Sequence, residues 1–182
     1  MFKKLTSILT ITVILLGTLS LTGCLGAGDP PGTYRNDAGN FSVVFPENWD
    51  YKENFMNLPV MAFTPLESET DQFQENISIS YETVGEEMTL DDYYDFSMES
   101  IKDMSSFFLN FKEIENSDMI LDEVPSKYST YTYTMQEVEI KVMFYLLIKN
   151  GRAYAITGTT TTETFDQYKT ELEKIAQSFR AK

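Results

Sequence analysis

Hydrophobic and polar residues alternate in short runs along most of the chain after residue 40. Alternation with a period of two is typical of a β-strand that buries one face. In the run 76–84, for example, Ile77, Ile79 and Tyr81 alternate with polar residues. The pattern predicts seven strands, over residues 41–45, 60–64, 76–84, 112–121, 127–135, 137–148 and 153–160, and loops over 50–58 and 66–75.

Two further segments repeat their hydrophobic residues every three or four positions, as amphipathic helices do. The first is predicted over residues 90–108, after the N-cap residue Thr89, and the second follows a cap at Thr162 or Thr164. The hydrophobic stripes are Leu90, Tyr94, Met98, Ile101 and Phe108 in the first helix and Phe165, Tyr168, Leu172, Ile175 and Phe179 in the second. We expect these stripes to pack on a sheet; a ligand surface is the alternative for the first.

The order of the elements predicts an α+β domain. Four consecutive strands with short connections imply antiparallel pairing, and Asn150-Gly151 is the dipeptide that a type I′ hairpin turn favours. The second half of the strand 137–148 is hydrophobic on both faces, which is typical of a central strand. We therefore expect a central antiparallel sheet of about six or seven strands flanked by helices, an α/β/α sandwich.

Residues 1–23 have the pattern of an export signal. Lys3 and Lys4 precede an uncharged, mostly aliphatic run at 5–21, which ends in Leu21-Thr22-Gly23-Cys24. This tetrapeptide resembles the L-x-[GA]-C lipobox of bacterial lipoproteins. The resemblance implies cleavage before Cys24 and a diacylglycerol on its thiol. A transmembrane or buried core helix is the alternative, although 17 uncharged residues are at the short limit for a span.

The composition of the mature chain restricts its location and partners. Residues 24–33 are small and rich in glycine and proline, so we expect a flexible tether before one domain at 34–182. Cleavage would remove two lysines and no acid, which changes the formal net charge from −14 to −16. Such a surface repels nucleic acid, and we expect no nucleic-acid partner. Most acidic surfaces are simply solvated; a functional acidic patch is the alternative.

Candidate chemistry is sparse. The chain has no histidine, and its one cysteine is the predicted lipidation site. This composition leaves no histidine base, no Ser-His-Asp triad and no disulfide within the chain. Nucleotide-binding glycine motifs and calcium loops are also absent from the sequence. We therefore predict no catalytic, cofactor-binding or metal-binding residue.

Three groups of side chains offer weaker alternatives. Glu86-Glu87 and Asp91-Asp92 could supply paired carboxylates, but a solvated helix start is the simpler interpretation. Adjacent residues such as Ser126 and Lys127 are no evidence for a Ser/Lys dyad. A third group of tyrosines could form an aromatic binding face, although strand packing explains them as well: Tyr93, Tyr94, Tyr128, Tyr131 and Tyr133.

Three stretches, in their order along the chain, resemble the PsbP-like group. They are FSVVFPENWD at 41–50, TLDDYYDFSMESI at 89–101 and KNGRAYAITGTTTTETFDQYKTELEKIAQSF at 149–179. This group is named for an extrinsic protein of photosystem II and includes bacterial and archaeal lipoproteins. The resemblance implies an α/β/α sandwich and a role in binding or assembly. Nothing in the chain points to photosynthesis, and that role is not carried over.

Three functions are therefore open. We favour a non-enzymatic lipoprotein, anchored in the cell membrane outside the cytoplasm through Cys24, that binds or assembles a protein partner in the envelope. The alternatives are an envelope enzyme with paired carboxylates and a small-solute-binding lipoprotein. Two facing acids in a deep cleft would favour the enzyme, and a closed apolar cavity would favour the solute-binding protein.

Overall fold

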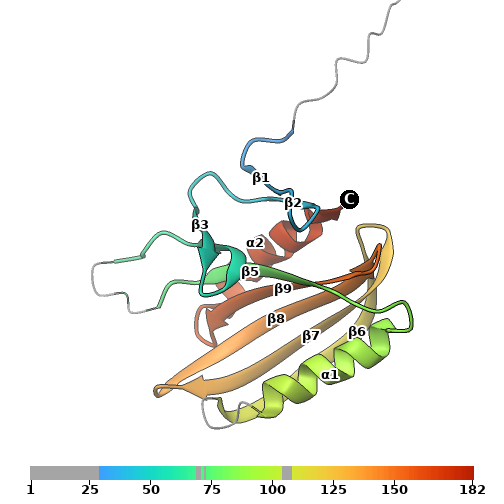
Figure 1. Cartoon of the computed structure of the whole chain (residues 1–182). Helices are drawn as coiled ribbons and strands as arrows, with labels where there is room; N and C mark the ends of the chain where they lie inside the picture. Colours follow the sequence, from blue (N-terminus) through green and yellow to red (C-terminus); the bar gives the residue numbers. More distant parts are fainter. Residues whose placement is uncertain (1–28, 69–70, 72, 104–107) are drawn as a thin grey trace, which may run out of the picture.

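A computed structural model describes residues 29–68, 71, 73–103 and 108–182 (Figure 1). The main sheet is antiparallel throughout, with the strand order β3-β4-β5-β9-β8-β7-β6. Its strands are β3 (Asp50–Phe55), β4 (Leu58–Phe63), β5 (Asn76–Thr83), β6 (Leu109–Leu121), β7 (Val124–Met135), β8 (Val138–Lys149) and β9 (Arg152–Thr161). A small sheet has the order β1-β2-β10, from β1 (Thr33–Asn36), β2 (Phe41–Val44) and β10 (Arg180–Ala181). The helices are α1 (Leu90–Asp103) and α2 (Phe165–Gln177).

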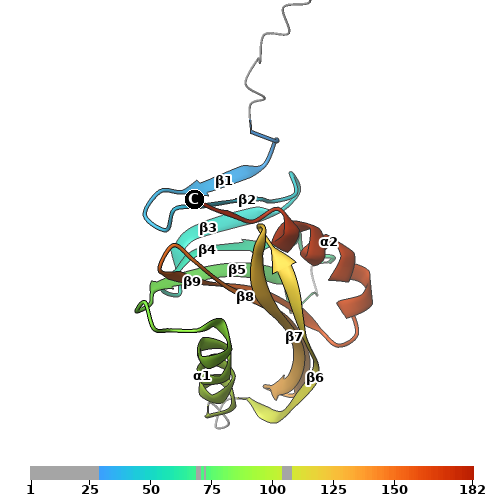
Figure 2. The ribbon, with the colours of Figure 1, turned by 90° about the vertical axis from the view of Figure 1, so that its right-hand side faces the viewer.

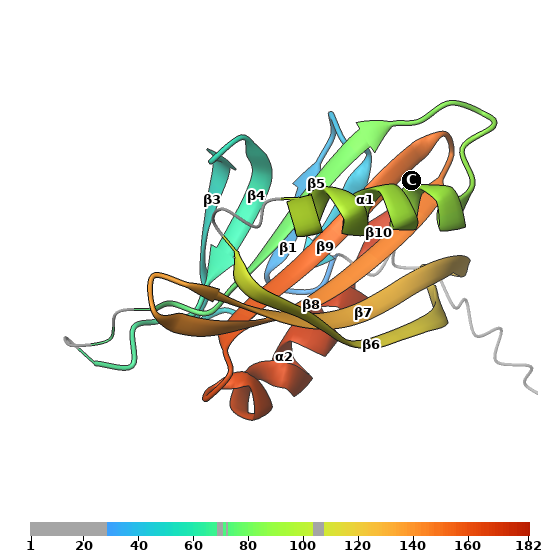
Figure 3. The ribbon, with the colours of Figure 1, turned by 90° about the horizontal axis from the view of Figure 1, so that it is seen from below.

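The two helices lie on opposite faces of the main sheet (Figures 2 and 3). The side chains of β8 alternate between two cores: Val142 and Phe144 pack under α1, whereas Met143 and Tyr145 belong to the core that includes α2. Both cores are largely closed to solvent, because these four side chains are each at most 5% exposed. The predicted α+β architecture is therefore confirmed, as is the central position of β8.

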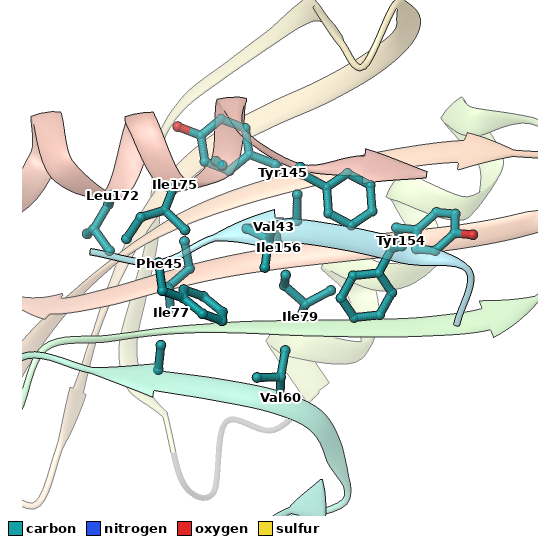
Figure 4. Close-up of a cluster of buried hydrophobic side chains, with 14 of the residues drawn as sticks. Val43, Phe45, Val60, Ile77, Ile79, Tyr145, Tyr154, Ile156, Leu172 and Ile175 are labelled. Carbon is teal, nitrogen blue, oxygen red and sulfur yellow. The ribbon is translucent and has the colours of Figure 1, made fainter. Parts of the chain in front are cut away.

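The core beneath α2 sets the position of that helix. Leu172 and Ile175 of α2 point toward Val43 of β2 and Ile156 of β9 (Figure 4). Gly158 of β9 lies directly below Leu172, where an added Cβ would be 3.2 Å from a Leu172 methyl carbon. This close approach, together with the packing of Phe179 on Phe41 at a ring-centroid distance of 5.6 Å, ties α2 to both sheets.

Several predicted elements and boundaries are wrong. The strand predicted over 41–45 is β2 of the small sheet, and Phe179 of the second predicted stripe lies beyond the end of α2 at Gln177. The segment 50–58, predicted as a loop, contains β3 and the start of β4. The helix predicted over 90–108 ends at Asp103, and Phe108 packs on Tyr133 from outside it at a ring-centroid distance of 4.2 Å. The predicted N-cap of α1 is correct, because the Asp92 backbone N–H donates to Thr89 Oγ1 at 3.1 Å.

Four hairpins turn in two residues that both have positive φ, as type I′ turns require. The turns are Met56-Asn57, Asp122-Glu123, Gln136-Glu137 and Asn150-Gly151. The turn at Asn150-Gly151 is confirmed. The other three contain no glycine, so their side chains are held in a left-handed conformation that is unfavourable for most residues.

Replacing Glu137 by glycine is therefore expected to stabilise the protein. Glu137 has a φ of 71°, and relief of its steric strain should exceed the entropy that glycine adds to the unfolded chain. We expect the free energy of unfolding to rise by about 0.5–1 kcal/mol in a urea titration. The matched control is Glu115→Gly in β6, which should lower it by about 0.5–1 kcal/mol, because glycine weakens a strand. An equal decrease in the free energy of unfolding for both variants would contradict the view that the backbone of Glu137 is strained.

Candidate functional site

A groove of about 710 Å³ lies between α2 and the N-terminal part of the domain. It is about twice as large as an acidic hollow of about 350 Å³ next to the β7–β8 turn. The groove is lined by Pro31, Val44, Phe45, Pro46, Glu47, Gln167, Thr170, Glu171, Lys174, Ile175 and Ser178. It therefore joins two segments that are more than a hundred residues apart in the sequence.

Backbone hydrogen bonds hold the N-terminal wall of the groove in place. The Phe45 N–H donates to the Gly32 carbonyl at 3.0 Å, and the Val44 N–H donates to Ser178 Oγ on the opposite wall at 2.9 Å. Gly32 has a φ of 77°, and an added Cβ would overlap the Phe45 carbonyl oxygen. Only glycine fits this crossing without strain, which keeps Pro31 against the groove.

The Pro-x-x-Trp stretch at 46–49 shapes the rim of the groove. The Trp49 N–H donates to the Pro46 carbonyl at 3.0 Å, which closes a turn, and the Trp49 ring is buried in the core. This anchored turn holds Pro46 and Glu47 beside α2. The Pro-x-x-Trp stretch, one of the markers of the resemblance to PsbP-like proteins, is thus part of the groove and its support.

The lining combines apolar side chains with a few charges. Phe45 and Ile175 are buried, whereas Glu47 and Lys174 are exposed and Glu171 is half-buried. The apolar surface open to a partner comes from Pro31, Val44 and Pro46, which are exposed or partly exposed, and the carboxylates beside them can pair with a cation. Among the lining residues there is no histidine or cysteine to serve as a general base or nucleophile.

The carboxylates that sequence reasoning singled out near the start of α1 have structural contacts. Asp91 pairs with Lys127 at 2.6 Å, and Asp92 takes part in the helix cap, where the Thr89 hydroxyl donates to its Oδ2 at 2.7 Å. Glu86 and Glu87 are exposed in the preceding loop. The structure thus gives these four acids no common site.

Ser126 and Lys127 do not form a catalytic dyad. The Ser126 hydroxyl donates to the Val124 carbonyl at 3.0 Å. The Lys127 ammonium donates to Asp118 at 2.6 Å and also contacts Asp91, and these hydrogen bonds raise the pKa of Lys127 above its usual range. An amine held in its charged form by two carboxylates cannot act as a general base.

The tyrosines do not share one binding face. Tyr131 and Tyr133 are buried under α1, whereas Tyr128 lies on the other side of β7 and packs on Tyr145 at a ring-centroid distance of 4.9 Å. The Tyr94 hydroxyl donates to Glu113 at 3.2 Å. The packing interpretation of this group is therefore confirmed.

The buried tyrosines make stability depend on alkaline pH. Burial raises the pKa of Tyr128 to about 12 and holds the pKa values of Tyr131 and Tyr145 still further above their usual range. The unfolded chain, with a tyrosine pKa of about 10, therefore releases these protons at a lower pH than the folded chain. The stabilisation from these groups is complete below about pH 10 and is lost as the pH rises above it.

We expect the free energy of unfolding to be lower at about pH 11 than at about pH 9. Tyrosinate absorbance near 295 nm, read during urea titrations, would show whether the buried rings ionise only on unfolding. Tyr145→Phe should reduce this pH dependence, and Tyr51→Phe, at an exposed position, should not. Ionisation of all eleven tyrosines near pH 10 in the folded protein would contradict the assignment.

Two buried carboxylates were not among the residues predicted from the sequence. Glu75 is 2% exposed and accepts a hydrogen bond from the Thr164 hydroxyl at the start of α2. The Asp122 side chain is 7% exposed and pairs with Lys149 at 2.7 Å. Both join distant segments, and no local sequence pattern marks either of them.

Cys24 and the predicted signal lie outside the described residues. Within the ranges that the structure does describe, no three His, Cys, Asp or Glu side chains form a group that could hold a metal ion. In the same part of the chain, no helix has both the length and the hydropathy needed to cross a bilayer.

Comparisons with known proteins identify the fold. The chain is similar to cyanobacterial PsbP (CyanoP) from Synechocystis sp. PCC 6803, with 17% identity and a TM-score of 0.65, over 89% of this chain and 99% of that one. It is also similar to LpqN, involved in cell envelope biogenesis of Mycobacterium tuberculosis, with 11% identity and a TM-score of 0.60, over 85% and 86% of the two chains. The Saccharomyces cerevisiae Ran-binding protein Mog1p has 8% identity and a TM-score of 0.56, over 82% and 94%. At these identities the likeness shows the fold alone.

No curated protein matches the chain. A family model does match: the DcrB model covers residues 46–178, which include both helices and every strand of the main sheet. The resemblance to PsbP-like proteins drawn from the sequence is confirmed at the level of the fold. The chain thus belongs to the DcrB family and has a PsbP-like fold.

Proposed function

We propose that the protein is a lipoprotein, anchored to the outer side of the cell membrane through Cys24, whose domain binds a protein partner in the envelope without catalysing a reaction. The lipobox-like sequence before Cys24 supports the anchor. DcrB membership and the likeness to LpqN, whose description places it in cell envelope biogenesis, fit an envelope protein.

The observation that carries the binding role is the groove beside α2. Its walls are held together by the hydrogen bond between Val44 and Ser178, and its lining is apolar with charges at the rim. A preformed surface of this kind costs little conformational entropy when a partner binds. The small-solute alternative is less well supported, because it requires a closed cavity. The groove is open to solvent, since three of its lining residues are exposed: Glu47, Thr170 and Lys174.

The anchor is tested by mass spectrometry of the protein purified in detergent from its host membrane. The expected N-terminal peptide begins at Cys24 and carries a diacylglyceryl group. A peptide that begins at Met1, with an unmodified thiol at Cys24, would overturn the proposal.

The binding role is tested by placing a photo-activated cross-linking residue at Thr170 on the groove or, as a matched control, at Glu163 outside it. A discrete protein adduct in living cells is expected from position 170 and not from position 163. The same adducts from both positions, or none from position 170, would count against a groove that binds a protein.

A further inference from the structure

The groove lies close to the point at which the tether enters the domain. Pro31 lines the groove, and Cys24 is seven residues earlier. A chain of seven residues spans at most about 25 Å when fully extended. If Cys24 carries the lipid, as the proposed function holds, the groove must remain within that distance of the membrane surface.

An exposed ion pair lies where the tether enters the domain. Arg35 Nε in β1 donates to Asp29 Oδ2 at 2.7 Å, and an exposed pair of this kind contributes little to stability. While it is formed, only residues 24–28 separate the lipid from this contact, a span of at most about 18 Å. The β7–β8 turn lies at the opposite end of the molecule from β1 (Figure 1). With a lipid on Cys24, the end that carries β1 would therefore face the bilayer.

The lining specifies the chemistry of the partner. Pro31, Val44 and Pro46, which are exposed or partly exposed, offer apolar contact. Glu47 and Glu171 supply two negative charges against the single positive charge of Lys174. A segment with apolar side chains next to Lys or Arg complements this surface, whereas an acidic segment is repelled. The mature net charge of −16 adds to that preference over longer distances.

The size of the groove indicates where such a segment must come from. A hollow of about 710 Å³ has room for only a short segment, and interfaces of this kind are weak between freely diffusing partners. Weak contacts become effective when both partners are held on one surface, because tethering raises their local concentration.

We propose that the groove docks a juxtamembrane segment, apolar and basic, on the outer side of an integral membrane protein in the same bilayer. This inference rests on the proposed lipid anchor. The tether brings the domain to the segment, Pro31, Val44 and Pro46 contact its hydrophobic side chains, and the acidic rim selects its charge.

The test uses the full-length lipidated protein in vesicles of neutral lipid. Because Cys24 is the chain's only natural cysteine, Thr170→Cys provides the only free thiol in the lipidated protein for an environment-sensitive dye. The probes are synthetic transmembrane peptides that end in an outer segment of Leu and Lys, of Leu and Glu, or of Gly and Ser. We expect the Leu-Lys peptide to saturate the signal at a density about tenfold lower than the other two.

Three comparisons make the result specific. The double variant Glu47→Gln, Glu171→Gln should remove most of the preference for the Leu-Lys peptide, whereas Glu163→Gln, outside the groove, should leave it unchanged. The Leu-Lys segment without its membrane span should bind about tenfold more weakly. A flexible Gly/Ser insertion of about 20 residues between Gly28 and Asp29 should also weaken binding, because it lowers the local concentration.

Equal signals from the three peptides, or an unchanged preference in the double variant, would overturn the inference. A signal that rises with protein density in the absence of peptide would also overturn it and would indicate that a second copy of the chain fills the groove. Flotation of the vesicles separates the two proposals: protein that does not float with the lipid contradicts the anchor, whereas protein that floats but does not discriminate contradicts only the juxtamembrane partner.

Discussion

A protein whose residues 1–23 are replaced by an ordinary cleavable export signal and that carries Cys24→Ala is expected to leave the membrane fraction almost completely. Each buried CH₂ of an acyl chain contributes about 0.8 kcal/mol to membrane binding, and two chains anchor a protein stably. In the residues that the structure describes, no helix is long and apolar enough to replace the lipid. Without residues 1–23 the chain would have a formal net charge of −16, and anionic head groups would repel it.

The signal has to be exchanged in this experiment, because an uncleaved segment 5–21 would itself keep the chain at the membrane. The control retains the natural residues 1–23 and Cys24. Immunoblots of the membrane and soluble fractions give the share of the protein in each fraction. If the exchanged protein stayed with the membrane, the domain would have a second attachment, and the lipid would not be the main anchor.

Asp122→Ala is expected to destabilise the fold by about 1–3 kcal/mol, because it leaves the backbone N–H of Ala181, a residue that is 7% exposed, without its hydrogen-bond partner. The Asp122 carboxylate accepts hydrogen bonds from Lys149 Nζ at 2.7 Å and from the Ala181 N–H at 2.8 Å. Arg180 Nε lies 3.8 Å from its other oxygen. One side chain thus joins the β6–β7 turn, the end of β8 and the C-terminal strand β10.

The matched control is Asp118→Ala. Asp118 contacts Lys127 at 2.6 Å, a similar distance, but the Asp118 side chain is 82% exposed whereas that of Asp122 is 7% exposed. Exposed ion pairs contribute about 0–1 kcal/mol, so this variant should unfold at nearly the wild-type urea concentration. A similar decrease in the free energy of unfolding for both variants would show that burial does not decide the strength of the Asp122 contacts.

The sequence predicted the main sheet well where one face of a strand is buried. In β5, Ile77 and Ile79 alternate with partly exposed serines, and this period of two was visible without the structure. The prediction failed at β3, where Lys52, Glu53 and Asn54 are all exposed. An edge strand that buries neither face shows no alternation, so only its pairing with β4 reveals it.

Turns and helix ends were likewise predicted only where their local sequence has a recognisable preference. Asn150-Gly151 could be identified because its residues favour positive φ, whereas Gln136-Glu137 adopts the same turn without any such preference. Phe108 continues the hydrophobic spacing of α1 but contacts Tyr133 from outside the helix. Its apolar character was predicted correctly, and the element that carries it was not.

The candidate site was less accessible than the fold. The groove brings Pro31 and Phe45 together with Thr170 and Ile175, and no local pattern connects these residues. The motif at 46–49 was noticed as a family marker, but its place on the rim depends on the packing of α2. The burial of Glu75 and Asp122 likewise arises only when distant segments meet.

The pairing of β1 has a mechanical consequence. In the small sheet β1 pairs with β2, and β2 continues directly into the groove at Val44 and Phe45. Thr33 at the start of β1 pairs with Val44 at the end of β2, so tension between an anchor at Cys24 and a molecule held at Val44 and Phe45 would pull on the same end of this antiparallel hairpin. The hydrogen-bonded pairs of β1 and β2 would then open one after another, before the pull reaches the seven strands of the main sheet.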